Sequence, residues 1–198
     1  KKKKTSNSVR GLYLSGYKSP AQQTNIDFWT IANGGTAQDF GDTSRAYYYA
    51  AATSSSHGGL NDGYQGTRPL PFNEAGGDLG LYFGGEPATS LPIQFINISS
   101  TGNSNSFSNA AVSAIDTNGG GNKTRGMVYS GAIPGSNIDD IRYVEFATKG
   151  NVAFFGDATA ARQIIGCAAN NTRLLGGGGA TPSNVNTIDY ITIGTLGN

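Results

Sequence analysis

Few side chains in this chain could carry acid–base, nucleophilic or metal chemistry. The sequence has one histidine (His57), one cysteine (Cys167) and three glutamates. A copper or zinc centre needs several His, Cys or Tyr ligands, and a glycosidase needs two carboxylates that converge in one cleft. The sequence marks neither set, so we expect no cofactor, no metal ion and no enzymatic activity.

Three weaker signals have structural interpretations. Residues 61–63, Asn-Asp-Gly, resemble a fragment of a calcium loop but lack its later ligands and its distal Glu. Asp42 and Asp157 each follow a glycine at one position of the repeat described below, and we expect them to cap turns. Cys167 lies among small residues, and we expect a buried, unreactive thiol.

Aromatic and amide side chains in irregular loops could recognise a sugar, because rings stack on sugar faces and amides bond hydroxyl groups. Two segments have this composition: the loop after residue 16 and a long stretch after residue 56. An ordinary polar loop has the same composition, and we favour that interpretation. The candidate ligand-binding residues are Tyr17, Lys18, His57, Asn61, Asp62, Tyr64, Gln65 and Arg68.

The elements that must position these residues are marked by an internal repeat. Four six-residue segments begin with an isoleucine, and these isoleucines are 67, 48 and 47 residues apart. A glycine follows each isoleucine by nine residues, and a phenylalanine follows the first three by 14. A segment of the Gly-Leu-Tyr type precedes each one. The leading isoleucines are Ile26, Ile93, Ile141 and Ile188.

Both repeated segments predict β-strands that are covered on both faces. In the first Ile-led segment, Ile26 and Phe28 point to one side of a strand, and Trp29 and Ile31 point to the other. A half-exposed strand would instead alternate apolar and polar residues. We therefore expect sheets that lie between neighbouring sheets, with glycines where backbones approach closely or φ is positive.

A third strand is predicted after each Phe-Gly-Asp type segment. These strands are rich in small residues, which suit close contact between sheets, and lie at 45–50, 111–115 and 163–167. Clusters of Asn, Gly, Ser and Thr between the strands predict turns, and 117–122 is the clearest of them.

The composition agrees with a turn-rich all-β protein. Of 198 residues, 37% are hydrophobic, 14% are charged and 30 are glycine, which disfavours helical bundles and doubly wound α/β folds. No run of 18 apolar residues occurs, so we expect no membrane partner. The net charge of +1 includes four lysines at residues 1–4. The remaining body is acidic on balance, and we expect it to bind no nucleic acid.

We divide the chain into a basic polar tail at 1–9 and a repeat domain at 10–198. The repeat units are 10–56, 79–124, 125–172 and an incomplete 173–198, with an insertion at 57–78. The fourth unit lacks its last segments and would leave an open sheet edge. N-terminal strands could close it, a partner could supply the rest, or the chain could be part of a longer protein. We favour the last two and expect the purified chain to oligomerise or aggregate.

A unit of about 48 residues with short strands and paired glycines is typical of a β-propeller blade, and its motifs resemble the kelch repeat. A hydrophobic strand that ends in Gly-Gly lies at 81–85, and an aromatic-bearing strand follows at 92–96. Residues 45–52 supply an arginine and a small-residue strand where kelch repeats carry them. This resemblance implies an all-β fold of kelch-like propeller blades.

A second resemblance concerns the source of the protein. Residues 186–193, combined with segments such as 39–42, are similar to repeats in virion proteins of marine tailed bacteriophages. This similarity implies a non-enzymatic structural component of a tail, fibre or capsid surface, located in the virion and bound to other virion subunits, most simply as a homo-oligomer. A carbohydrate-binding module that recognises a host-surface glycan is the alternative. A hydrolase or lyase is the third hypothesis, and the few His and Glu residues weigh against it.

Overall fold

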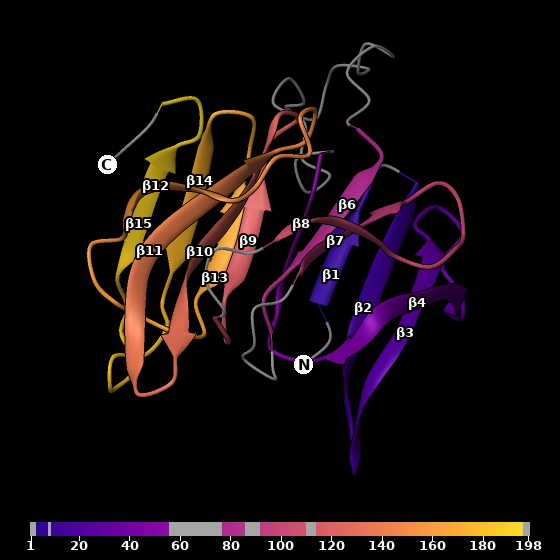
Figure 1. Cartoon of the computed structure of the whole chain (residues 1–198), viewed down its shortest axis with the longest axis horizontal. Helices are drawn as coiled ribbons and strands as arrows, with labels where there is room; N and C mark the ends of the chain where they lie inside the picture. The colour runs from indigo at the N-terminus through magenta and orange to yellow at the C-terminus, as the bar shows by residue number, and fades with distance from the viewer. Residues whose placement is uncertain (1–2, 8, 56–76, 86–91, 110–113, 196–198) are drawn as a thin grey trace.

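The computed structural model describes residues 3–7, 9–55, 77–85, 92–109 and 114–195. These residues form 15 β-strands in four antiparallel sheets and no helix (Figure 1). The all-β prediction is therefore confirmed. Within the described ranges, no helix is long and apolar enough to cross a membrane.

Each sheet is a meander in which strands follow one another in chain order. We name them sheets I to IV from the N-terminus. Sheet I contains β1 (Lys3–Ser6), β2 (Arg10–Lys18), β3 (Ala21–Thr30) and β4 (Gln38–Tyr47). Sheet II contains β5 (Ala51–Ser54), β6 (Leu79–Phe83), β7 (Pro92–Asn97) and β8 (Asn105–Asn109). Sheet III contains β9 (Asn118–Gly121), β10 (Arg125–Ile133), β11 (Ser136–Glu145) and β12 (Ala153–Asp157). Sheet IV contains β13 (Gly166–Ala169), β14 (Arg173–Gly177) and β15 (Ile188–Thr192).

The sequence repeat is also a repeat of structure. The Gly-Leu-Tyr segments form the second strand of each sheet, and the Ile-led segments form the third, as predicted. The two strands pair in the same register throughout. The residue two positions after each leading isoleucine faces one equivalent second-strand residue: the pairs are Leu12 and Phe28, Leu81 and Phe95, Met127 and Tyr143, and Leu175 and Tyr190.

The strand predicted after each Asp is wrong in its boundaries. The Phe-Gly-Asp type segments lie within the fourth strands β4, β8 and β12, so the strand begins before the Asp. The carboxylate of Asp42 accepts a hydrogen bond from the Thr24 hydroxyl at 2.8 Å, which is a bond between strands instead of a turn cap. The predicted small-residue strands are also misplaced, because residues 45–47 end β4 and only 166–167 of the segment 163–167 lie in a strand, β13. The first strands of the next sheets, β5, β9 and β13, begin further along the chain than predicted. Each sheet therefore begins with residues from the preceding repeat unit.

Side by side, the four sheets form an array with sheet I at one end and sheet IV at the other (Figure 1). Three apolar layers lie between them. Leu12 and Ile26 of sheet I pack with Ile96 of sheet II. Equivalent residues fill the layer between sheets II and III and the layer between sheets III and IV. The inner sheets II and III are thus covered on both faces, as the apolar pattern predicted. For the outer sheets the prediction is wrong, because Ile31 beside sheet I and Ile188 of sheet IV are exposed.

Short first strands lie in a row through the array, with β5 beside both β1 and β9, and β9 beside β13. Small residues allow this approach. A Cβ atom on Gly120 would lie 2.5 Å from the Leu174 side chain and 3.2 Å from Ala169 Cβ, so a larger residue would force the strands apart. The turn predicted at 117–122 is therefore wrong, because residues 118–121 are strand β9.

Candidate functional site

Of the eight candidate ligand-binding residues, two lie in the described part of the chain. Tyr17 and Lys18 are exposed at the end of β2. The Tyr17 ring lies 5.7 Å from the ring of Tyr48, which lies 4.5 Å from that of Tyr49. The other six are outside the described residues: His57, Asn61, Asp62, Tyr64, Gln65 and Arg68.

An acidic group lies at one edge of sheet III. Asp139, Asp140 and Asp157 have carboxylate oxygens within 4.8 Å of one another. Asp140 is paired with the guanidinium of Arg142 on the same strand, so part of its charge is neutralised. Nothing further at this group points to a cation. Elsewhere, Cys167 is half-buried against the layer between sheets III and IV, and so is less buried than predicted.

A polar motif that our sequence analysis overlooked recurs at the turn between first and second strands. Asn7, Asn122 and Asn170 each accept a hydrogen bond from the backbone N–H of an arginine three residues later, at 2.7, 2.9 and 2.7 Å. This is an Asx turn, in which the side chain replaces a backbone acceptor. Its sequence signal is Asn-x-x-Arg at a constant repeat position.

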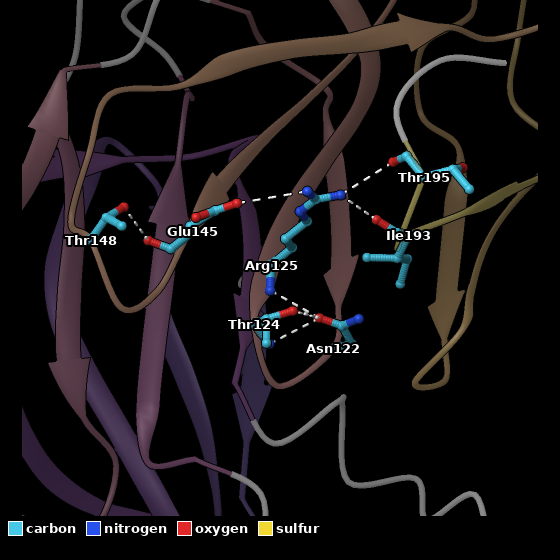
Figure 2. A network of polar contacts seen from close by, with 7 residues as sticks. All are labelled: Asn122, Thr124, Arg125, Glu145, Thr148, Ile193 and Thr195. Atoms are coloured by element: carbon cyan, nitrogen blue, oxygen red, sulfur yellow. Dashed lines mark hydrogen bonds and ion pairs between the residues drawn. The ribbon is translucent and has the colours of Figure 1, made fainter.

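These arginines join one sheet to the next. Arg125 donates to the backbone carbonyl of Ile193 at 2.7 Å and to that of Thr195 at 3.2 Å, so sheet III is tied to sheet IV (Figure 2). Its guanidinium also lies over the Tyr143 ring and 3.7 Å from the Glu145 carboxylate. The guanidinium thus contacts two backbone carbonyls, an aromatic ring face and a carboxylate at the same time.

Arg10 repeats this arrangement between sheets I and II. It donates to the Ile98 carbonyl at 3.2 Å and lies over the Phe28 ring at 4.7 Å. Sheet II has Leu79 at the arginine position. Lys149, in the connection between β11 and β12, instead lies over the Phe95 ring at 4.7 Å. A cation therefore covers the equivalent aromatic ring in each of the first three sheets.

A buried ion pair fastens sheet III to sheet IV from within. Arg162 Nη2 lies 2.5 Å from Asp189 Oδ2, and the two side chains are 0% and 6% exposed. The Tyr129 hydroxyl and the Thr159 hydroxyl donate to the same carboxylate oxygen, at 3.1 and 2.9 Å. Burial, followed by the Asp189 charge, raises the pKa of Tyr129, so its phenol stays a neutral donor.

Gln94 occupies the repeat position of Asp189 and fastens sheet II to sheet I. Its side-chain amide donates to the Tyr47 hydroxyl at 2.5 Å, and its oxygen accepts the backbone N–H of Ser44 at 2.9 Å. Burial raises the pKa of Tyr47. In both places buried polar groups are used to hold neighbouring sheets together. Sequence reasoning singled out neither Gln94 nor the Arg162–Asp189 pair.

Sheet IV leaves a large apolar face open. Ile188 is 73% exposed, whereas Ile26, Ile93 and Ile141, its counterparts in the other sheets, are all 0% exposed. Leu175 is 42% exposed, and its three counterparts are likewise 0% exposed. Tyr190 is exposed beside them, with Arg173 over its ring at 4.6 Å. We call Leu175, Ile188, Tyr190 and Arg173 the open face of sheet IV.

No family model and no curated protein matches this chain.

Proposed function

We propose that this protein is a non-enzymatic structural component that assembles with other subunits through its sheet faces, as part of a phage virion. The open face of sheet IV carries the proposal. Burying a large apolar side chain contributes about 1.5–3 kcal/mol, and the positions of Leu175 and Ile188 are fully buried in the other three sheets. A large patch of this kind marks an interaction surface.

The array also supports propeller-blade architecture. Three of the four sheets are four-stranded antiparallel meanders, as propeller blades are, and the first strands of neighbouring sheets lie side by side. The buried arginine and tyrosine networks support a structural role for the polar residues, since they join adjacent sheets. Surface loops would then present side chains for assembly or host attachment.

Particle fractionation of the native source tests the virion assignment. We expect peptides of this chain to sediment with phage structural proteins at a constant ratio, measured by quantitative mass spectrometry across a density gradient. Recovery of the chain solely in the free protein fraction would overturn the virion assignment.

A second candidate function, carbohydrate binding, is favoured by Tyr17, which is exposed at the end of β2, and by the half-buried Tyr48 and Tyr49 beside it. Tyr17 is 54% exposed and begins a run of rings through Tyr48 to Tyr49. Such a run offers flat apolar faces on which sugar rings can stack, with Lys18 beside it as a hydrogen-bond donor.

Glycan binding measured on an array and by calorimetry tests this candidate. Tyr17→Ala is expected to weaken binding at least tenfold, which corresponds to about 1.4 kcal/mol. Tyr190→Ala removes an exposed tyrosine of sheet IV and should leave glycan binding unchanged. Equal binding by the Tyr17→Ala variant and the parent would remove this site from consideration.

A further inference from the structure

Each of the three apolar layers between the described sheets joins two distinct kinds of face. The front face of a sheet carries the leading isoleucine of its third strand, such as Ile26 or Ile141. The back face carries the residues three and five positions later, such as Ile96 and Ile98 in sheet II. In all three layers the front of one sheet packs against the back of the next.

Among the residues that the structure describes, two faces of the array have no such partner. One is the front of sheet IV, described above. The other is the back of sheet I, where Ile31 is 49% exposed, although its counterparts Ile98, Phe146 and Ile193 are between 0% and 8% exposed. Trp29 is half-buried on the same face, with its ring 4.8 Å from that of Tyr13. Both faces are apolar. One is a front face and the other is a back face, which is the combination that packs together in all three layers.

We propose that the front face of sheet IV binds the back face of sheet I in a second copy of this chain, so that copies associate head to tail. This inference rests on the proposed assembly function and names the partner. Within one chain the two sheets lie at opposite ends of the array, with sheets II and III between them (Figure 1). The front of sheet IV therefore meets the back of sheet I in another molecule.

Hydrogen bonding specifies the same pairing. Arg10 and Arg125 donate to the carbonyls of Ile98 and Ile193 in the following sheet. Arg173 has the same Asx turn before it and the same aromatic ring beneath it.

Sheet I offers the matching acceptor. Ile31 occupies the position of Ile98 and Ile193, and its N–H is bonded to the Val9 carbonyl just as those of Ile98 and Ile193 are bonded within their own sheets. In the assembled pair, Arg173 donates to the Ile31 carbonyl of the second copy, as Arg125 does to Ile193.

An interface between unlike faces has a consequence for assembly. It is heterologous, so repeated association makes a closed ring when the rotation between copies closes and a filament when it does not. Each copy then has one donor face and one acceptor face. A substitution that disrupts either face should block growth of the assembly, while the other face of the same copy can still bind its partner face.

The test measures mass against concentration for the full chain, by sedimentation velocity and light scattering. We expect the parent to form dimers or larger species. Ile188→Asp on sheet IV and Ile31→Asp on sheet I should each weaken self-association at least 100-fold. Both positions are exposed in the single chain, so circular dichroism and the melting temperature of the dilute, unassociated chain should match those of the parent. Phe154→Asp is the control, since this residue is 54% exposed and lies on neither open sheet.

Mixing the two variants gives the decisive result. Ile31→Asp keeps an intact sheet IV and Ile188→Asp keeps an intact sheet I, so the mixture should form one-to-one dimers that grow no further. A parent that remains monomeric at all concentrations would overturn the proposal, and so would a loss of association in Ile188→Asp alone. These outcomes would leave co-sedimentation with virion proteins intact, so the proposed function and the head-to-tail partner can fail separately.

Discussion

Arg162→Met is expected to lower the free energy of unfolding by about 3–5 kcal/mol. The substitution removes the guanidinium but leaves the Asp189 carboxylate buried without its counter-charge, and an unpaired buried charge carries that cost. Arg162 also donates to the backbone carbonyls of Gly178 and Thr187, which lose their donor. Urea unfolding followed by fluorescence measures the change.

The double variant Arg162→Met/Asp189→Leu separates charge from packing. Replacing both members of a buried pair by apolar residues is often neutral or stabilising, so the double variant should regain most of the lost stability. The Tyr129 and Thr159 hydroxyls lose their acceptor in it, which limits the recovery. A single variant as stable as the parent would show that the pair does not hold sheets III and IV together.

Ile141→Ala is expected to destabilise the chain by about 2–5 kcal/mol, and Ile188→Ala by well under 1 kcal/mol. The two residues occupy the same repeat position in neighbouring sheets, but Ile141 is fully buried and Ile188 is exposed. The first substitution leaves a cavity between sheets III and IV, and the second shortens a side chain that faces outward. Urea unfolding at low protein concentration, where copies do not associate, measures both.

Raising the protein concentration supplies the control for this pair. If a second copy covers Ile188, the cost of Ile188→Ala should grow with concentration, because association stabilises the folded state by mass action. The cost of Ile141→Ala should stay constant. Equal losses for both variants in the dilute chain would contradict the exposure that separates them.

The strands that carry large apolar residues could be predicted from the sequence. The Ile-led and Gly-Leu-Tyr segments have apolar residues at both parities, and each became a strand as expected. Strand β9 could not be predicted in this way, because Asn-Gly-Gly-Gly has no side-chain pattern and is typical of a turn. Gly120 is explained by the closeness of Leu174 and Ala169, which are distant in sequence.

The residues that join neighbouring sheets were likewise predictable only in part. The Asn-x-x-Arg motif was visible at repeat positions, but its role depends on a carbonyl in the next sheet, which no local pattern indicates. Arg162 and Asp189 are 27 residues apart and meet across a sheet boundary. Tyr17 and Lys18 were expected in an irregular loop after residue 16, but they are the last residues of strand β2 and pair with Gln22 and Ala21 of β3.

The offset between repeat unit and sheet has a consequence for how such a chain can be lengthened. A gene segment that encodes 125–172 contributes β10, β11 and β12 to one sheet and β13 to the next. A tandem duplication of that segment would therefore insert a module whose last strand is the first strand of the following sheet. The repeat unit and the sheet are offset by one strand. Each added repeat unit would therefore be joined to the next sheet by a strand that it contributes to that sheet, as well as by side-chain packing.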